Sequence, residues 1–374
     1  MAKRVFLIVM DSFGVGESPD AYKYGDQGSN TLASVFGDQD FNAPTLYSLG
    51  LFNIDGVTVG NRHPSPRANF ARLEELSQGK DTVSGHWEIA GLVSDTAFPT
   101  YPDGFDEEIL QKLKDATGRN ILCNKPYSGT QLLLDYGRQH VATGDLIVYT
   151  SADSVLQIAT HEDVVPVEEL YEICKKARKI MSGKDAVGRI IARPFVGEYP
   201  NYTRTSNRHD YALPPPQDTL FDQLKALGFD TIGVGKTGDI FCMKGVSQSY
   251  PTKSNADGMQ KMTELVERDF CGLCFTNLVD FDSHYGHRND VKGYAKAVAE
   301  FDLWLKDFLP KLKEEDLLII TADHGCDPAT PSTDHSREYV PCLIYQKGVT
   351  DGKNLGTKKG FFFVADTVKD FLTK

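Results

Sequence analysis

Three observations predict an α/β fold in which helices flank a mostly parallel central sheet and a second, α+β domain is inserted into the chain. Short, continuous runs rich in Val, Ile and Leu are typical of strands covered on both faces. Segments with helical periodicity lie between these runs, and this alternation favours an α/β core. Two proline-rich stretches, AFPTYPDGF and YALPPPQD, border a middle segment with its own helix and strand patterns.

Each apolar run of the predicted sheet is followed by acidic residues. VFLIVM precedes Asp11, CFTNLV precedes Asp280 and Asp282, and LLIITA precedes Asp323 and His324. In open α/β sheets, ligands bind beyond the carboxyl ends of the strands. We therefore expect three strands to deliver ligand groups to one edge of the sheet.

The segments between the runs predict helices and a discontinuous core. TLFDQLKALGF and GYAKAVAEFDLWLKDFLPKL have helical periodicity, and the first of them resumes the α/β pattern after the second proline-rich stretch. We expect residues 1–98 and 216–374 to form one catalytic core, and residues 99–215 to form the inserted domain.

The net charge of the chain limits the classes of molecule that it is expected to bind. Its 374 residues include 40 Lys and Arg against 52 Asp and Glu, a net charge of −12. This acidic balance predicts no nucleic-acid or anionic-membrane partner. It does not exclude a phosphorylated small molecule, because a metal or an arginine cluster can outweigh the global field locally.

The N-terminal apolar run and the cysteines predict a cytoplasmic protein. Val5 to Met10 is only six residues long and ends at Asp11, unlike a secretory signal. No run approaches the ~20 apolar residues of a membrane span. The seven scattered cysteines indicate reduced thiols, and the Cys271-x-x-Cys274 match is interpreted as structural.

The polar residues after the strands predict a metal centre. Asp282 and His287 are five residues apart, and His335 follows His324 by eleven residues. Oxygen and nitrogen ligands without thiolates suit Mn²⁺, Zn²⁺ or Mg²⁺, and two sets suit a two-metal centre for phosphoryl transfer. Alone, Asp11 could equally cap a helix, and the Asp282/His287 spacing also occurs in polar loops. Their combination with the adjacent Asp323 and His324 favours metal binding.

The stretch DTVSGHWE offers two hydroxyl nucleophiles, Thr82 and Ser84. A metal would activate either hydroxyl at neutral pH, so no neighbouring base is required. His86 is therefore interpreted as a structural residue, and Gly85 as a close approach of the backbone to the metal site.

The stretch GVGKTGD is not a Walker A loop. The motif requires a glycine five positions before the Gly of GKT, and that position holds Asp230. Lys236 remains a candidate phosphate contact as a point charge.

Seven motifs, in order, resemble the alkaline phosphatase superfamily and, within it, the phosphopentomutases over nearly the whole chain: MDSFGVGESPDA, DTVSGHWE, IVYTSADSVLQIATHE, IARPFVG, NRHDYAL, NLVDFDSHYGHRND and TADHGCDPATPSTDHSREYVPCLIY. The resemblance implies an alkaline-phosphatase-like core, two Mn²⁺ ions per chain and a cytoplasmic enzyme of nucleoside catabolism. It implies an isomerase that interconverts the 1- and 5-phosphates of ribose and 2-deoxyribose through a pentose bisphosphate. The alternatives within the superfamily are a cofactor-independent phosphoglycerate mutase and a metal-dependent phosphatase.

The resemblance also implies the roles of individual residues. Thr82 carries the phosphoryl group. One Mn²⁺ is held by Asp11, Asp323 and His324, and the other by Asp282, His287 and His335. In the inserted cap domain Asp153 contacts a ribose hydroxyl, and the distal phosphate is bound by Arg193, Arg208 and the core residue Lys236.

A sugar bisphosphate such as glucose 1,6-bisphosphate is a candidate activator, and the oligomeric state is left open. One residue departs from the expected pattern. Cys326 stands where relatives are expected to have a polar amide. A thiol two residues from a metal ligand favours a softer metal or oxidation, but it removes no ligand.

Overall fold

The chain divides into two compact units. The computed structural model describes residues 3–151 and 154–374. The core unit combines the N-terminal segment up to Ala97 with Pro214–Lys374, and the inserted unit is Phe98–Leu213. The junctions therefore fall one and two residues before the expected boundaries. Leu213 belongs to the inserted unit because its N–H donates to the carbonyl of Gly188 (2.9 Å).

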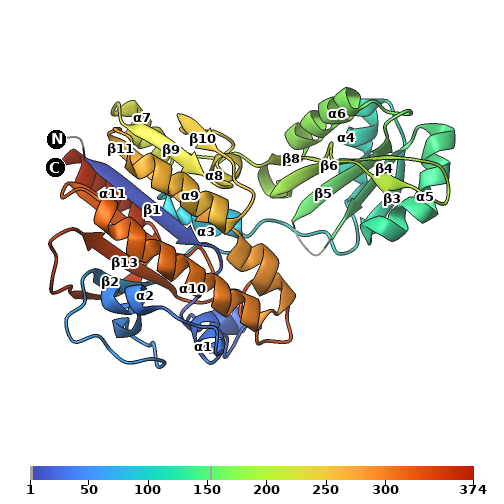
Figure 1. The fold of residues 1–374 in the computed structure, drawn as a ribbon. Helices are drawn as coiled ribbons and strands as arrows, with labels where there is room; N and C mark the ends of the chain where they lie inside the picture. Colours follow the sequence, from blue (N-terminus) through green and yellow to red (C-terminus); the bar gives the residue numbers. More distant parts are fainter. Residues whose placement is uncertain (1–2, 152–153) are drawn as a thin grey trace. The chain divides into compact units, whose positions relative to one another are not determined.

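An eight-stranded sheet forms the centre of the core unit (Figure 1). Five neighbouring strands, in the order β10-β9-β11-β1-β12, are parallel, and the antiparallel β13 joins them to the parallel pair β2 and β14. This confirms the predicted α/β class with a mostly parallel sheet. The strands are β1 (Arg4–Met10), β2 (Asn69–Glu74), β9 (Asp230–Val234), β10 (Gln248–Tyr250), β11 (Gly272–Leu278), β12 (Asp316–Thr321), β13 (Val340–Gln346) and β14 (Asn354–Lys359).

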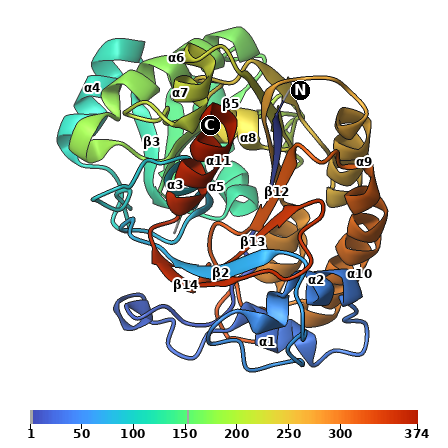
Figure 2. The same cartoon turned by 90° about the vertical axis from the view of Figure 1, so that its left-hand side faces the viewer.

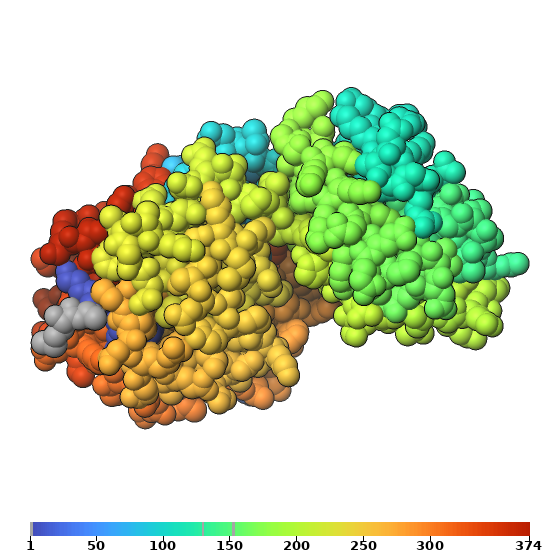
Figure 3. All heavy atoms as spheres, turned by 90° about the horizontal axis from the view of Figure 1, so that it is seen from above, coloured from blue at the N-terminus to red at the C-terminus, as the bar shows by residue number. Residues whose placement is uncertain are grey.

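Helices cover both faces of this sheet. Figure 2 shows α9 and α10 on one side of the strands, and α3 and α11 on the other. In Figure 3 the yellow and orange segments, which include α7, α9 and α10, cover most of the visible face of the core unit. The helices are α1 (Thr31–Phe36), α2 (Pro44–Leu49), α3 (Thr82–Ile89), α7 (Leu220–Ala226), α8 (Thr237–Ile240), α9 (Asn255–Val266), α10 (Val291–Phe308) and α11 (Phe363–Thr373).

Burial on both faces explains the continuous apolar runs of the central strands. Every residue of β1, β11 and β12 is buried. Because successive side chains of a strand point to opposite faces, a strand covered on both faces has mostly apolar residues in succession instead of an alternating pattern. The helices predicted from TLFDQLKALGF and GYAKAVAEFDLWLKDFLPKL are observed as α7 and α10.

The inserted unit has its own sheet and two small cores. Its strands run in the order β3-β4-β5-β6-β7, and β8 pairs with β6. Neighbouring residues of β4 face opposite sides: Val148 packs in one apolar cluster with α4 and α6, whereas Ile147 packs in another with α5. The elements are β3 (Ile121–Pro126), β4 (Leu146–Thr150), β5 (Val155–His161), β6 (Arg189–Val196), β7 (Thr203–Arg204), β8 (His209–Ala212), α4 (Glu107–Thr117), α5 (Gly129–Thr143) and α6 (Val167–Ile180).

No helix in the described part of the chain is both long enough and apolar enough to cross a bilayer.

One buried ion pair aligns the starts of two central strands. Arg4 of β1 lies in register with Asp316 of β12, and its guanidinium donates two hydrogen bonds to that carboxylate (2.8 and 2.6 Å). The same guanidinium donates to the carbonyls of Val266, the last residue of α9, and of Arg268 (2.9 and 2.7 Å). Arg4 therefore ties two strands and a helix end together at a buried position.

Replacing Arg4→Met should lower the free energy of unfolding of the core unit by about 3–5 kcal/mol, because it leaves the Asp316 carboxylate buried and unpaired. Urea denaturation of the full chain measures this change. Lys311→Met, which removes a largely exposed pair with Glu267, is the matched control and should change stability by less than about 1 kcal/mol. Equal effects of the two substitutions would contradict a structural role for the buried pair.

Candidate metal centre

Three parallel strands bring acidic residues to one edge of the core sheet. β1 lies between β11 and β12, with Met10 opposite Leu278 and Val9 opposite Thr321. Asp11 directly follows β1, and Asp323 follows β12 by two residues. Asp282 lies in the π-helical turn Phe281–Tyr285 after β11. The strand ends therefore place three carboxylates close together, and all three are buried.

The first cluster consists of Asp11, Asp323 and His324. The Nε2 atom of His324 lies 3.4 Å from Asp11 Oδ1 and 3.3 Å from Asp323 Oδ2. The ligand atoms of all three residues lie within 4.8 Å of one another, an arrangement that could hold a metal ion. Asp11 does not cap a helix, because a turn follows β1. Its Oδ1 atom and Asp323 Oδ2 are buried and have imidazole nitrogens at ion-pair distance, but they accept no hydrogen bond of good geometry from the described residues.

The second cluster is centred on Asp282. Its Oδ2 atom lies 3.2 Å from His287 Nε2, and its Oδ1 atom lies 3.4 Å from His335 Nε2. Two groups could hold a metal here: Asp282 with His324 and His335, and Asp282 with His287 and Cys326. The carboxylate thus joins two ligand groups, and the thiol of Cys326 lies within one of them.

A hydrogen bond orients the imidazole of His287 in the second cluster. His287 Nδ1 lies 2.6 Å from the carbonyl oxygen of Thr333, so the ring donates there and leaves Nε2 as the atom that faces Asp282. The ring centroids of His324 and His335 are 4.0 Å apart, and those of His287 and His335 are 4.6 Å apart. In contrast, His284 is largely exposed and belongs to neither cluster.

The pKa shifts in the two clusters indicate that the buried carboxylates favour positive charge nearby. Burial, followed by the charge of Asp323, raises the pKa of Asp11. Burial alone would lower the pKa of His324, but the carboxylates of Asp323 and Asp11 raise it well above its usual value. The hydrogen bond to Asp282 raises the pKa of His287 to about 9. A divalent cation would supply the charge that these protons supply here.

Thr82, and not Ser84, faces the first cluster. Thr82 is the first residue of α3, and its Oγ1 atom lies 3.2 Å from His324 Nε2. Asp81 caps the helix by accepting from the N–H groups of Val83 and Ser84. Ser84 Oγ donates to the same carboxylate (2.7 Å), so its hydroxyl is engaged in the cap.

Gly85 allows α3 to approach Asp323. A Cβ atom at Gly85 would lie 2.1 Å from the carbonyl oxygen of Asp323, far inside van der Waals contact. Only glycine permits the helix to pack this closely. This agrees with the predicted close approach of the backbone at this position.

His86 and Asn277 orient the carboxylates of the first cluster. His86 Nδ1 lies 3.0 Å from Asp323 Oδ2 and 2.9 Å from the carbonyl oxygen of Thr82. Its Nε2 atom accepts from the side-chain amide of Asn277 (3.0 Å), which also donates to Asp11 Oδ2 (3.0 Å). The sequence predicts a structural role for His86, and the structure gives its contacts: Asp323 and Asn277. Asn277 was not predicted, although a polar residue inside the buried run CFTNLV was a usable signal.

Two further cations join the segment before Thr82 to the segment around His335. Lys80 pairs with Asp26 and Asp334 (both 3.1 Å). Arg337 is almost completely buried, and its guanidinium donates to the carboxylates of Asp20 and Glu75 and to the carbonyls of Glu75, Ser77 and Gly79. The sequence gives no period or motif that would have singled out these long-range contacts.

The predicted substrate contacts lie in both units. In the inserted unit, Arg193 Nε donates to Gln157 (3.1 Å), and Arg208 makes a bidentate contact with Asp210 (2.8 and 2.6 Å). Lys236 is exposed at the start of α8 in the core unit. Asp153 lies outside the described residues.

A third arginine accompanies Arg193 and Arg208. Arg204 Nη2 donates to the Tyr149 hydroxyl (3.0 Å). Burial raises the pKa of Tyr149, and the positive charges of Arg204, Arg193 and Arg208 oppose that rise. Burial, and then the charge of Arg208, lowers the pKa of Arg193. This concentration of positive charge suits a phosphate, and sequence reasoning missed Arg204.

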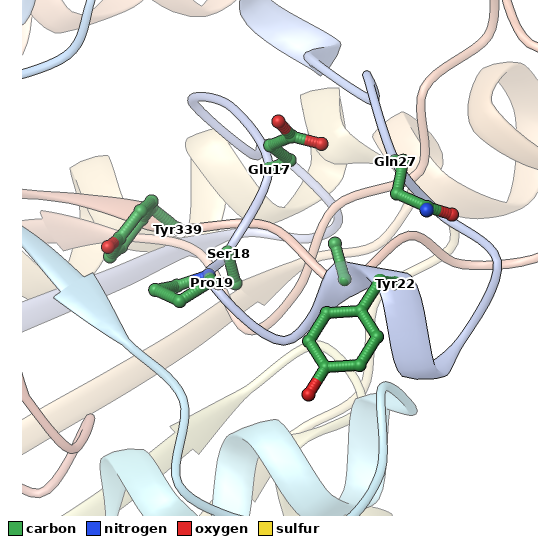
Figure 4. Close-up of a pocket in the computed structure, with 7 residues that line it drawn as sticks. Glu17, Ser18, Pro19, Tyr22, Gln27 and Tyr339 are labelled. Carbon is green, nitrogen blue, oxygen red and sulfur yellow. The ribbon is translucent and has the colours of Figure 1, made fainter.

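Figure 4 shows a pocket of about 310 Å³ elsewhere in the core unit. None of the predicted site residues lines it. The lining residues are Glu17, Ser18, Pro19, Ala21, Tyr22, Gln27 and Tyr339.

Replacing Gly85→Ala should weaken metal binding and lower the free energy of unfolding by about 1–3 kcal/mol, because the new methyl group collides with backbone that cannot rotate away. Calorimetric titration with Mn²⁺ and urea denaturation measure the two effects. Gly37→Ala is the control, since a Cβ atom there meets nothing within 4 Å and φ is −73°. Unchanged affinity in Gly85→Ala would show that the close approach does not shape the site.

Substitutions of His86 should separate its two hydrogen-bonding atoms. Asparagine places an amide donor near Nδ1 and can still reach Asp323, whereas glutamine places its amide near Nε2. We expect His86→Asn to keep most of the Mn²⁺ affinity and His86→Gln to lose about 10–100-fold, the usual scale for an outer-shell partner. Titration of each folded variant measures this difference, and equal affinities would contradict the orienting role.

Comparisons with known proteins identify the family of the chain. The sequence pattern of the Metalloenzyme superfamily matches residues 3–373. The chain is 55% identical to a phosphopentomutase from Lachnoclostridium phytofermentans over 370 residues, which cover 99% of this chain and 95% of that one. It is 53% identical to a phosphopentomutase from Acetivibrio thermocellus over 371 residues, which cover 99% and 96%.

Solved structures also resemble this fold, and one of them aligns over the whole chain. The PH0037 protein from Pyrococcus horikoshii aligns over 100% of this chain and 98% of its own, with a TM-score of 0.52 and 16% identity. At that identity the likeness concerns the fold alone, and the sequence relatives carry the assignment. The chain therefore belongs to the Metalloenzyme superfamily and to the phosphopentomutase family, whose members are mutases and thus isomerases.

Proposed function

We propose that the chain interconverts the 1- and 5-phosphates of ribose and 2-deoxyribose through a phosphothreonine at Thr82 and a pentose bisphosphate intermediate. The observation that carries this proposal is the contact between Thr82 Oγ1 and His324 Nε2 (3.2 Å), which places a hydroxyl at the edge of a buried carboxylate cluster. Thr82 is also the first residue of α3, and a helix N-terminus favours a phosphate group there.

The two clusters offer carboxylate oxygens and imidazole nitrogens, the donor types that suit Mn²⁺. Asp11, Asp323 and His324 would hold one ion, and Asp282, His287 and His335 the other. Buried carboxylate oxygens whose near partners are imidazoles, without hydrogen bonds of good geometry, support this assignment, since such atoms are costly unless a positive charge binds them. When bound, the ions would neutralise charge on the transferred phosphoryl group and on the attacking and leaving oxygens.

The residues of the chain have three tasks in the proposed transfer. Thr82 Oγ1 gives its phosphoryl group to the free hydroxyl of the pentose monophosphate, and the other phosphate of the resulting bisphosphate then returns to Thr82. Asp81 holds the start of α3 in place, and His86 orients Asp323. Catalysis of a loose phosphoryl-transfer transition state depends mainly on such positioning and on electrostatics.

The inserted unit would recognise the sugar phosphate. Arg193, Arg204 and Arg208 concentrate positive charge around Tyr149, and guanidinium groups suit bidentate contact with phosphate oxygens. We assign the distal phosphate to Arg193, Arg208 and Lys236, and a ribose hydroxyl to Asp153. A mutase must also keep water away from its phosphothreonine, because water would hydrolyse it. We propose that the inserted unit serves this exclusion of water.

A sugar bisphosphate such as glucose 1,6-bisphosphate would restore the phosphothreonine if it were lost to hydrolysis. The same transfer geometry serves this priming reaction, because the donor is again a sugar phosphate and the acceptor is again Thr82 Oγ1.

Substitution of the two hydroxyl residues tests the nucleophile. With Mn²⁺ and ribose 1-phosphate, the wild-type enzyme should form ribose 5-phosphate with little free phosphate. Thr82→Ala should lower kcat by about 10³-fold or more, because the phosphoryl acceptor is gone. Ser84→Ala, which loses only a contact within the helix cap, should keep most of the activity.

Two outcomes would contradict the proposal. Release of phosphate without isomerisation would identify a phosphatase rather than a mutase. Wild-type activity in Thr82→Ala would exclude Thr82 as the phosphoryl carrier.

A further inference from the structure

The loop after β12 places a thiol beside the second cluster. The sulfur of Cys326, a carboxylate oxygen of Asp282 and a ring nitrogen of His287 all lie within 4.8 Å of one another. These three side chains come from two separate segments of the chain and form one of the groups that could hold a metal. The thiol is therefore not an isolated buried cysteine but a member of a potential ligand set.

Backbone contacts hold Cys326 in this position. Its N–H lies 3.1 Å from the carbonyl oxygen of Ser12 and 3.2 Å from Thr31 Oγ1. On the opposite side Gly286 packs against it, because a Cβ atom at Gly286 would lie 2.9 Å from the sulfur. Gly286 immediately precedes His287, so this packing keeps the thiol and the imidazole close together.

A second observation points to a cation at this place. Asp282 Oδ1 and His335 Nε2 are buried atoms that lie 3.4 Å apart, and neither has a hydrogen bond of good geometry to a described residue. His287 uses Nδ1 toward the carbonyl of Thr333 and therefore presents Nε2 to the Asp282 carboxylate. The ligand atoms are oriented toward a common space, as expected for residues that bind an ion.

The chemistry of the donor set decides which ions use the thiol. Thiolates select soft or borderline ions such as Zn²⁺, Co²⁺ and Cd²⁺, whereas Mn²⁺ prefers oxygen and imidazole. Bonds of about 2.0–2.3 Å in a tetrahedral site place neighbouring ligand atoms about 3.6 Å apart. Ligand atoms already within 4.8 Å can reach that spacing by small side-chain rotations.

We propose that Cys326 is an alternative ligand of the second metal site, which binds a thiophilic divalent ion between Asp282, His287 and the Cys326 sulfur. Mn²⁺ leaves the thiol unligated. The proposal rests on the metal assignment made above and adds that the second site distinguishes thiophilic ions from Mn²⁺. On binding, the sulfur lone pair forms the bond to the metal and the thiol proton passes to solvent. Such an ion would displace Mn²⁺ from this site.

Cobalt provides a direct readout of the ligand. The metal-free full-length protein is titrated with Co²⁺, whose visible bands report binding and whose near-ultraviolet charge-transfer band reports a sulfur ligand. The wild type should develop both signals. Cys326→Ser should keep the visible bands and lose the charge-transfer band, while the control Cys271→Ser should retain both.

Competition gives a second, independent measurement. Cys326→Ser should lower the affinity for Zn²⁺ by about tenfold or more, on the scale of a lost metal-site partner, and leave the affinity for Mn²⁺ within about twofold. Equal losses for the two ions would mean that the serine disturbs the whole site, and would overturn the proposed selectivity.

The cobalt spectra separate failure of this inference from failure of the proposed function. Visible bands without a charge-transfer band in the wild type would show a metal site that does not use Cys326. A charge-transfer band that persists in Cys326→Ser would assign the sulfur to another cysteine. Absence of all Co²⁺ binding would overturn the metal centre itself.

Discussion

The candidate metal centre depends on holding three buried carboxylates, which repel one another, at one edge of the core sheet. The parallel pairing of β11, β1 and β12 places Asp282, Asp11 and Asp323 at neighbouring strand ends. Two unit charges about 4 Å apart interact by about 4 kcal/mol at an effective dielectric constant of about 20. Such a site is stable only with nearby positive charge. The imidazoles supply part of it, and bound cations would supply more.

Residues around the two clusters hold the mutually repelling carboxylates in position. His86 and Asn277 join Asp323 to Asp11, and Gly85 lets α3 pack against the backbone of Asp323. Arg337 and Lys80 connect the segment before Thr82 with the loop that carries His335. These contacts link the proposed phosphoryl carrier to both clusters, so the geometry of the site depends on side chains well outside the ligand set.

Local patterns in the sequence were sufficient for the fold and for most of the candidate site. Continuous apolar runs predicted buried parallel strands, because both faces of the sheet are covered. Acidic residues after these runs predicted a ligand edge, because the strands are parallel and end together. The resemblance to the family supplied the pairing of ligands and the choice of Thr82, which neither spacing nor composition could provide.

Only the tertiary structure decided which partners meet across the chain. It left Thr82 facing His324, and it placed Arg204 and Arg337 in contacts that no local pattern indicates. It also brought Cys326 into one ligand group with Asp282 and His287. The physical reason is the same in each case. Periodicity reports which face of an element is buried, but contacts between distant segments depend on how those faces pack in three dimensions.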